Sequence, residues 1–376
     1  MINDRRQLAD VYQQTIDIVL EGHYTSENGE EVKLLDNTKM LRGSRFYTKP
    51  LDASNVPSLA EGSTKIIVKN DDSIHCGHQL QQEGYNPVVL NLASRRNPGG
   101  GVKNGSRAQE ESLFRSTNLF LSMYRYAEYA EDYGLEKSKF QYPMPVRFGG
   151  IYVPDATVFR AGAKDNFALL DTPYYMSFVA VAAINHPDLD RDGNICEEDT
   201  ALTKNKMRTM LRIGLLNGHD SIVLGAFGCG AFHNPPKHIA RLFHEVIDEK
   251  EFMDKYKLIA FAILEDHNSP RGGNLQPFIE EFKSYTPTDL AFPSATDFQF
   301  TDFHRWGLIS SNQCLVSHTL LAGRRGSSCA RCPNHEPCAH DLWSASNAHR
   351  CMQQSGLHTL KFLTRHSLHQ QLMTQH

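Results

Sequence analysis

A glycine-rich turn between a predicted buried strand and a predicted helix constrains the fold of this chain most. Residues 87–93 read PVVLNLA, a short run rich in Val and Leu that is typical of a buried strand in a parallel sheet. The turn NPGGG follows, and three consecutive glycines indicate backbone dihedrals that other residues rarely adopt. Apolar residues from Leu113 to Leu121 recur at helical spacing, so we expect a helix that opens at Glu110 and Glu111. Open α/β sheets bind ligands at such strand ends.

The rest of the chain fits an α/β fold. Residues Leu8 to Val19 have one apolar helical face, and Gly22 is a plausible helix end. A helix beginning near His75 is expected to connect two strands in a βαβ unit. The predicted strands cover residues 65–69, 87–93, 151–160, 175–183, 221–224 and 257–264. We therefore predict a mixed, mainly parallel sheet between helices.

A second glycine cluster, residues 225–236, reads GAFGCGAFHNPP and lies between the strand 221–224 and an amphipathic helix over 239–247. Exposed backbone N–H groups in such a loop, helped by the helix dipole, make a site for an anion such as a diphosphate. Cys229 alone suggests a thiol nucleophile, but no sequence feature identifies a base for it. A packing role is favoured.

Glu110 and Glu111 are the candidate catalytic acids. Adjacent helical residues project about 100° apart, so the two cannot do the same job on one atom. One could donate a proton while its neighbour orients the substrate. The alternative is a glycine turn followed by an acidic helix start, which suits the helix dipole. Common nucleotide motifs do not fit: no GK[ST] follows the turn, and GxGxxG fails at Asn104.

These segments resemble the bacterial-type poly(ADP-ribose) glycohydrolases, a branch of the macrodomain fold. The triple glycine, Gly99 to Gly101, is followed after seven residues by the QEE of Gln109 to Glu111. The segments NLASRRNPGGG, AQEESL, IYVPDATVFR and VLGAFGCGAFHNPP stand in the family's order, over about residues 1–285. The resemblance implies a macrodomain-like mixed sheet flanked by helices, with an N-terminal helical segment that packs on the core.

The resemblance also implies an activity, the hydrolysis of ribose–ribose O-glycosidic bonds in poly(ADP-ribose) with release of ADP-ribose. Glu111 would be the general acid and then the base, and Glu110 would hold ribose hydroxyls. Such bonds break through an oxocarbenium-like state in which the leaving oxygen needs a proton. No cofactor is required for this chemistry. The alternatives are a hydrolase of single ADP-ribose groups on an acceptor, and a non-catalytic ADP-ribose reader.

The same resemblance implies the substrate-binding residues. Asn97 with Gly99, Gly100 and Gly101 would shape the catalytic loop, and Gln109 would support it. Around the diphosphate and distal ribose, main-chain contacts would come from Gly228, Cys229, Gly230 and Ala231, while Phe232 would pack on the ribose. A tyrosine stripe, formed by Tyr124, Tyr126, Tyr129 and Tyr133, is predicted to be core packing rather than an adenine pocket.

Charge and hydropathy bear on partners and location. A net charge of −4 and a pI near 6.5 argue against broad binding to nucleic acid, while a local basic pocket for phosphates stays open. The sequence shows neither a signal peptide nor an apolar run long enough to cross a bilayer. We expect an intracellular protein, cytoplasmic or nuclear, whose partners are poly(ADP-ribose) or ADP-ribosylated macromolecules and not a membrane.

We predict three regions and two metal sites. The regions are an N-terminal helical segment (1–64), a macrodomain-like catalytic domain (65–288) and a Cys/His-rich extension (289–376). In the extension, structural zinc and unligated thiols are both open for Cys329, Cys332, Cys338 and Cys351. The insertion from Asp188 to Asp199 has the ligand order of a calcium loop, although it departs at Cys196 and Asp199. A solvated acidic connection is the alternative.

Overall fold

The computed structural model describes residues 4–265, 269 and 272–285. Seven strands form one sheet, and all neighbours run parallel except at β6, which is antiparallel to both β3 and β7. In order across the sheet they are β3 (Arg45–Tyr47), β6 (Gly150–Arg160), β7 (Leu169–Val181), β5 (Pro87–Leu92), β8 (Ser221–Leu224), β9 (Leu258–Ala262) and β4 (Lys65–Lys69). The predicted mixed, mainly parallel sheet is confirmed.

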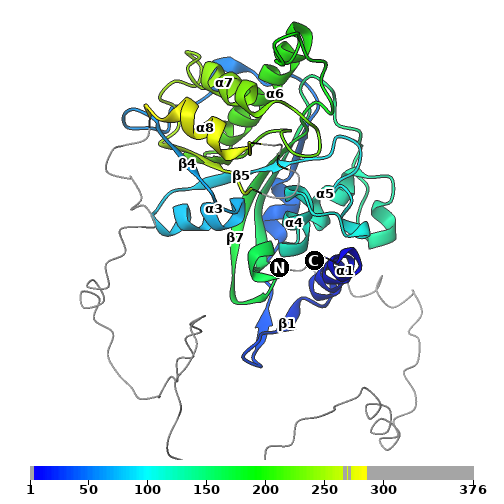
Figure 1. The fold of residues 1–376 in the computed structure, drawn as a ribbon. Coiled ribbons are helices and arrows are strands. Elements are labelled where there is room, and N and C mark those ends of the chain that lie inside the picture. The colour runs from blue at the N-terminus through cyan, green and yellow to red at the C-terminus, as the bar shows by residue number, and fades with distance from the viewer. Residues whose placement is uncertain (1–3, 266–268, 270–271, 286–376) are drawn as a thin grey trace, which may run out of the picture. The chain divides into compact units, whose positions relative to one another are not determined.

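Helices cover both faces of this sheet (Figure 1). One face carries α3 (Ser73–Gln82), α4 (Gln109–Ser116) and α5 (Phe120–Met123), and the other carries α6 (Glu197–Leu216), α7 (Pro236–Ile247) and α8 (Leu275–Phe282). The central strand β5 supplies both cores, since Val88 and Leu90 pack with the second layer while Val89 packs with the first. A strand buried on both faces explains the continuous apolar run in its sequence.

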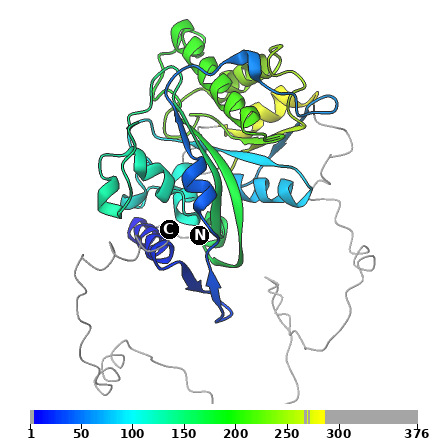
Figure 2. The ribbon, with the colours of Figure 1, turned by 180° about the vertical axis from the view of Figure 1, so that it is seen from behind.

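The N-terminal segment lies against the layer that holds α4. It comprises α1 (Arg5–Glu21), a hairpin of β1 (His23–Thr25) and β2 (Glu31–Lys33), and α2 (Thr38–Gly43). The far side of the molecule shows the same segment on the outside of that layer (Figure 2). Helix α1 ends where Gly22 adopts φ 80°, as predicted, and buries Leu8, Tyr12 and Ile16. Its apolar face therefore closes the core behind α4.

Two local predictions need correction. The helix after the glycine turn does not continue to Leu121 but ends at Ser116, because Thr117 forms a β-bridge with Val158 and a new helix begins at Phe120. The strands β4 and β5 are not neighbours, since β9 and β8 lie between them. The expected βαβ unit, β4–α3–β5, is therefore present as a crossover connection. Its two strands are separated in the sheet by β9 and β8, which come later in the sequence.

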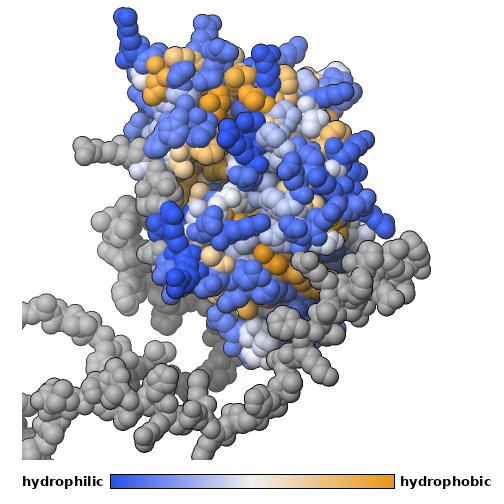
Figure 3. Space-filling model, turned by 90° about the vertical axis from the view of Figure 1, so that its right-hand side faces the viewer, coloured by the Kyte–Doolittle hydropathy of each residue, from blue (hydrophilic) through white to orange (hydrophobic). Residues whose placement is uncertain are grey.

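The face drawn in Figure 3 is mainly hydrophilic, with apolar residues in separate patches among polar ones. Among the helices of residues 4–265 and 272–285, none combines the length and the apolar character that a bilayer crossing needs. The unit Gln299–His376, and with it the extension's four cysteines at 329, 332, 338 and 351, lies outside the described residues.

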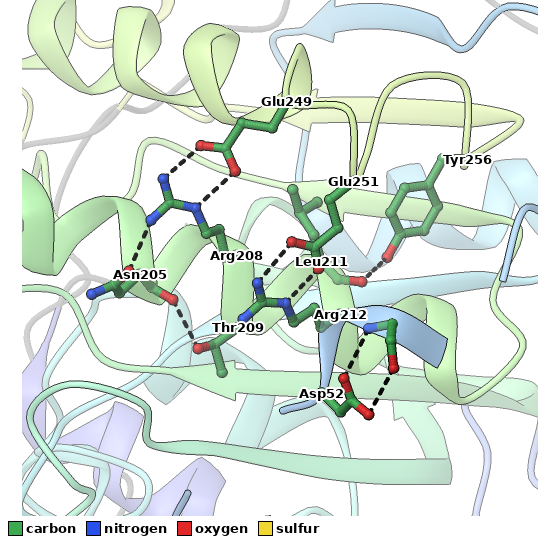
Figure 4. Close-up of polar contacts among 10 residues, drawn as sticks. Asp52, Asn205, Arg208, Thr209, Leu211, Arg212, Glu249, Glu251 and Tyr256 are labelled. Atoms are coloured by element: carbon green, nitrogen blue, oxygen red, sulfur yellow. Dashed lines mark hydrogen bonds and ion pairs between the residues drawn. The ribbon is translucent and has the colours of Figure 1, made fainter. Parts of the chain in front are cut away.

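Paired arginines tie α6 to the segment that follows α7 (Figure 4). Arg208 donates to both oxygens of Glu249, at 2.8 and 2.6 Å, and Arg212 donates to both oxygens of Glu251, at 2.5 and 2.7 Å. The Arg212 and Glu251 side chains are 15% and 18% exposed. Two-point guanidinium–carboxylate contacts of this kind are the stronger class of charged hydrogen bond.

We predict that Arg212→Met lowers the free energy of unfolding by about 1–3 kcal/mol, between the cost expected for an exposed pair and that for a buried one. The substitution leaves Glu251 largely buried without its cation. Lys250→Met, which removes an exposed cation from the same segment, is the control and should change stability by less than about 0.5 kcal/mol. Urea unfolding of the three proteins checks this, and equal stabilities would show that the pair contributes nothing.

Candidate functional site

A cavity of about 450 Å³ opens at the carboxyl ends of the parallel strands. Its walls come from the residues that follow four of them, namely Asp71–Ser73 after β4, Leu92 and Ala93 at the end of β5, Gly225–Phe232 after β8 and Ile263–Glu265 after β9. The volume suits a small ligand, which proteins usually hold in cavities of about 300–1,000 Å³. The cavity lies at the edge of the sheet where we predict the site.

The second glycine loop presents unbonded backbone donors to this cavity. In the described part of the chain, the N–H groups of Gly228, Gly230, Ala231 and Phe232 donate to no protein acceptor, and all four residues line the cavity. The Asn234 amide braces the loop by donating to the carbonyls of Gly228 and Phe232 and to that of Ile184. Converging N–H groups held rigid in this way suit an anion.

Cys229 turns away from the cavity. Its side chain is 2% exposed, its Sγ donates weakly to the Phe227 carbonyl at 3.8 Å, and burial raises the pKa of its thiol. A buried thiol that resists ionisation is a poor nucleophile. The packing role that we favoured for Cys229 is therefore supported, and the contact of its backbone with a ligand stays a prediction.

The triple-glycine turn folds directly over the first turn of α4. Gly99 and Gly100 adopt φ values of 78° and 55°, which other residues rarely tolerate. A Cβ on Gly100 would lie 2.5 Å from Oε1 of Glu111 and 3.2 Å from Oε2 of Glu110. Glycine is therefore needed here for its dihedrals and also because two carboxylates approach the backbone.

Glu110 is fixed by two backbone donors. Its carboxylate accepts from the Ser94 N–H at 2.7 Å and from the Gly99 N–H at 3.1 Å. The side chain is 3% exposed, and this burial, together with the charge of Glu111, raises the pKa of Glu110 from 4.5 to about 8. At neutral pH Glu110 therefore holds a proton inside the folded protein.

Glu111 keeps one oxygen free. Its Oε1 accepts from the Gly101 N–H at 2.8 Å, whereas Oε2 is buried and has no protein partner. Neither glutamate lines the cavity, and neither does the turn 99–101 that contacts their carboxylates. The expectation that Glu111 and the Gly228 loop face one cleft is therefore not met in this arrangement.

Gln109 links three elements around the cavity. Its amide oxygen accepts from the Leu92 N–H at 2.9 Å, and its amide nitrogen donates to the Leu90 carbonyl at 2.7 Å and to Ser73 Oγ at 3.0 Å. At the end of β5, the Gln109 side chain thus makes the two hydrogen bonds that the backbone of an adjacent strand would otherwise make. None of these partners lies in the loop 97–101, so support of that loop by Gln109 stays a prediction.

Asn97 begins the turn through its backbone. Its carbonyl accepts from the Gly100 N–H at 3.0 Å, and its own N–H donates to Ser94 Oγ at 3.2 Å. The residue is exposed and does not line the cavity. A direct contact of its side chain with a ligand stays a prediction.

The glycine turn has two supports that the sequence did not reveal. Lys103, in the short helix η2 (Val102–Asn104), places Nζ 4.2 to 5.2 Å from the ring centroids of Tyr124, Tyr129 and Tyr133. Such cation–π contacts hold the end of the turn against the tyrosine stripe, which packs in the core as predicted. Lys103 lies 21 residues before Tyr124, so no local sequence pattern marks this contact.

Arg115, one turn after Glu111 on α4, is the second support. It is fully buried, and it donates to the Leu8 carbonyl of α1 at 2.9 Å and to the Ser106 carbonyl at 2.6 Å. Thr15 Oγ1 of α1 donates back to the Arg115 carbonyl at 2.6 Å. The N-terminal helix is therefore bonded to the helix that carries both glutamates.

The acidic insertion forms a local turn. The Asp190 carboxylate accepts from the N–H groups of Asp192 and Asn194, and Gly193 adopts φ 78°. Within residues 4–265 and 272–285, no three His, Cys, Asp or Glu side chains gather as a metal site. Calcium binding between Asp188 and Asp199 stays an untested prediction.

The chain is similar to known proteins over this region. Residues 12–161 match the family model described as microbial-type PARG, catalytic domain. A poly(ADP-ribose) glycohydrolase from Thermomonospora curvata is 27% identical, with 74% of this chain and 100% of that one covered at a TM-score of 0.62. The structure of its complex with the inhibitor ADP-HPD is 28% identical, with the same coverage of both chains and a TM-score of 0.61. The Deinococcus radiodurans enzyme in complex with ADP-ribose is 27% identical, with 67% of this chain and 99% of that one covered at a TM-score of 0.54. No curated protein matches the chain.

We predict that Glu110→Gln changes how stability depends on pH. Between the ordinary pKa of 4.5 and the raised value of about 8, the folded wild type holds a proton that the unfolded chain has lost. Unfolding then releases a proton, so wild-type stability falls by roughly 1 kcal/mol per pH unit across this window relative to the variant. The variant carries a constant cost, since its amide cannot accept from both N–H groups.

Urea unfolding at pH 5, 6.5 and 8 measures the difference between the two proteins, with the exposed Glu128→Gln as control. A difference that stays constant across this range would show that Glu110 is ionised in the folded state.

Proposed function

Because the chain belongs to the microbial-type poly(ADP-ribose) glycohydrolase family, we propose that it hydrolyses ribose–ribose O-glycosidic bonds of poly(ADP-ribose) and releases ADP-ribose, with Glu111 as the catalytic acid and base. The relatives from Thermomonospora curvata and Deinococcus radiodurans are enzymes of this activity, and their complexes hold ADP-HPD and ADP-ribose. The observation that carries the catalytic assignment is the buried, unpartnered Oε2 of Glu111. A buried carboxylate oxygen without a partner awaits a ligand, since leaving it unbonded is costly.

The cavity would hold ADP-ribose by its diphosphate. The free N–H groups of Gly228, Gly230, Ala231 and Phe232 supply the donors, and Phe232, which lines the cavity, packs on the distal ribose. Neutral N–H donors bind a diphosphate without the desolvation cost of burying additional charges. The anomeric carbon of that ribose then lies toward the glycine turn and the glutamates beneath it.

The two glutamates divide the chemistry. Protonated Glu111 gives its proton to the departing oxygen as positive charge grows on the anomeric carbon, and ionised Glu111 then removes a proton from the attacking water. Glu110 holds ribose hydroxyls, because each of its oxygens accepts one backbone N–H and the protonated carboxyl group still offers one O–H donor and an acceptor site. Since Oε2 of Glu111 is buried and Glu111 does not line the cavity, the ribose reaches Oε2 only when the chain around it shifts, and the glycine dihedrals of the neighbouring turn 99–101 permit such a shift.

The catalytic unit that we propose comprises residues 65–288, with residues 1–64 packed on it. This division is supported by the cavity lining, because every lining residue except Leu8 lies between Asp71 and Asn274. Leu8 belongs to α1 in the N-terminal segment. The reaction uses no cofactor, so a metal in residues 289–376 would have a structural role.

We predict that Glu111→Gln lowers turnover of poly(ADP-ribose) by at least about 100-fold, the usual contribution of a general acid–base residue. The substitution keeps the size of the side chain and removes its titrating proton. ADP-ribose affinity, measured by calorimetry, should stay within about threefold of wild type, because the diphosphate loop is untouched. Glu128→Gln, an exposed glutamate changed in the same way, should retain full turnover.

The same assay with a mono-ADP-ribosylated protein decides between substrates. Faster removal of the single group than of polymer units would contradict the proposed polymer activity. Wild type that binds ADP-ribose but cleaves neither substrate would make the protein a reader. Unchanged turnover in Glu111→Gln would show that another residue is the catalytic acid and base.

A further inference from the structure

The guanidinium group of Arg115 has one nitrogen that no protein acceptor uses. Its Nε donates to the Leu8 carbonyl at 2.9 Å and its Nη2 to the Ser106 carbonyl at 2.6 Å. The third nitrogen, Nη1, is buried and has no hydrogen-bond partner among the described residues. The Phe167 ring centroid lies 5.6 Å from the guanidinium carbon and adds a cation–π contact. An unsatisfied buried donor costs free energy, so this nitrogen calls for an explanation.

A buried acceptor without a partner lies one helical turn before this donor. In α4, Glu111 precedes Arg115 by four residues, and residues at this spacing are neighbours on a helix surface. The Glu111 Oε1 atom accepts from the Gly101 N–H at 2.8 Å, whereas Oε2 has no partner in the part of the chain that the structure describes. A free guanidinium donor and a free carboxyl acceptor therefore lie on the same side of one helix.

A chain of hydrogen bonds places the guanidinium group beside Glu111. Because Ser106 precedes α4, the Arg115 side chain reaches its carbonyl only by running back along the helix face that carries Glu111. The Ser106 N–H donates to the Gly101 carbonyl at 3.2 Å, and the Gly101 N–H donates to Glu111 Oε1 at 2.8 Å. The two side chains are therefore linked through Ser106 and Gly101, although they do not bond to each other.

Arg115 also lies between Glu111 and the cavity. Arg115 lines the cavity together with Leu8 and Phe167, whereas Glu111 does not. The free Nη1 atom is buried, so it lies on the protein side of the guanidinium group and not toward the open cavity. Arg115 shares a helix with Glu111 and is also bonded to Leu8 of α1, so its position does not depend on the glycine turn alone.

We propose that Arg115 is a positioning residue for Glu111, and that its Nη1 donates to the Glu111 carboxylate when the Gly101 N–H moves away with the glycine turn. The inference rests on the proposed function, in which the chain around Oε2 shifts before the ribose reaches it. The carboxylate then has a donor before and after the shift and keeps one orientation. One oxygen is held by Arg115, and the other is available to the departing oxygen and the attacking water.

The test is a double-substitution cycle of Arg115→Lys and Glu111→Gln. Lysine keeps the positive charge but cannot occupy the positions of all three guanidinium nitrogens. Wild type, the two single variants and the double variant are measured for kcat and KM with poly(ADP-ribose), for ADP-ribose affinity and for melting temperature. Arg212→Met is the matched control, because Arg212 also makes two hydrogen bonds through its guanidinium group but does not line the cavity.

We expect Arg115→Lys to lower kcat about 10- to 100-fold, the scale of loss when a catalytic group is slightly misplaced. KM and ADP-ribose affinity should stay within about threefold of wild type, because the diphosphate loop is unchanged. In the Glu111→Gln background the same substitution should lower kcat by less than about twofold, since Arg115 acts through Glu111. Arg212→Met should be less stable than wild type and keep its kcat within about twofold.

Arg115→Ala gives a second test that does not depend on how lysine packs. Guanidinium chloride at about 50 mM, far below the molar concentrations that unfold proteins, should restore part of its turnover, and sodium chloride should not. Losses that multiply in the double variant, or an ADP-ribose affinity that falls as far as kcat, would show that Arg115 supports the fold or the cavity and not Glu111. Unchanged kcat in Arg115→Lys would show that Arg115 has no positioning role. Wild type without turnover would refute the proposed function and, with it, the basis of this inference.

Discussion

The hydrogen bonds from the Ser94 and Gly99 N–H groups to Glu110 fix the geometry on which the site depends. They join the end of β5 to the first turn of α4 and hold the Glu110 carboxyl group in a buried position. This burial raises the pKa of Glu110, so that the group stays protonated at neutral pH. The approach requires Gly99 and Gly100, because a side chain at position 100 would meet both carboxylates. The triple glycine, the acidic pair and the strand end are therefore one structural unit.

The two glycine loops solve different physical problems. In the first loop, the N–H groups of Gly99 and Gly101 donate to the carboxylates of Glu110 and Glu111. In the second loop, the N–H groups of Gly228, Gly230, Ala231 and Phe232, which line the cavity, have no protein acceptor. In the proposed mechanism, the substrate diphosphate and the catalytic acid would be held by separate backbone segments that follow the neighbouring strands β8 and β5. Gln109 joins these parts, since it lines the cavity and also extends the end of β5.

The sequence predicted those elements that depend on interactions between residues close together in the chain. The strands 65–69 and 221–224 appeared as expected, because short apolar runs bounded by turns have few other arrangements. The motif around the triple glycine and the QEE sequence lies within the residues that match the family model. The early end of α4 was missed because Thr117 forms a bridge with Val158, a distant partner. The supports of the glycine turn were missed for the same reason, since Thr15 and Arg115 lie 100 residues apart and Lys103 and Tyr124 lie 21 apart.

The order of the strands has a consequence for the chain while it is being made. The edge strand β4 is synthesised before β5, yet it joins the sheet only through β9, whose residues come about 190 positions later. A nascent chain that ends before Leu258 therefore holds both glutamates but lacks β9 and the cavity wall that follows it, and its β4 has no partner in the sheet. Long-range pairing of this kind forms late. A ribosome-bound chain should thus be inert toward ADP-ribose until nearly all of the described domain has emerged, and should then acquire its cavity in one step.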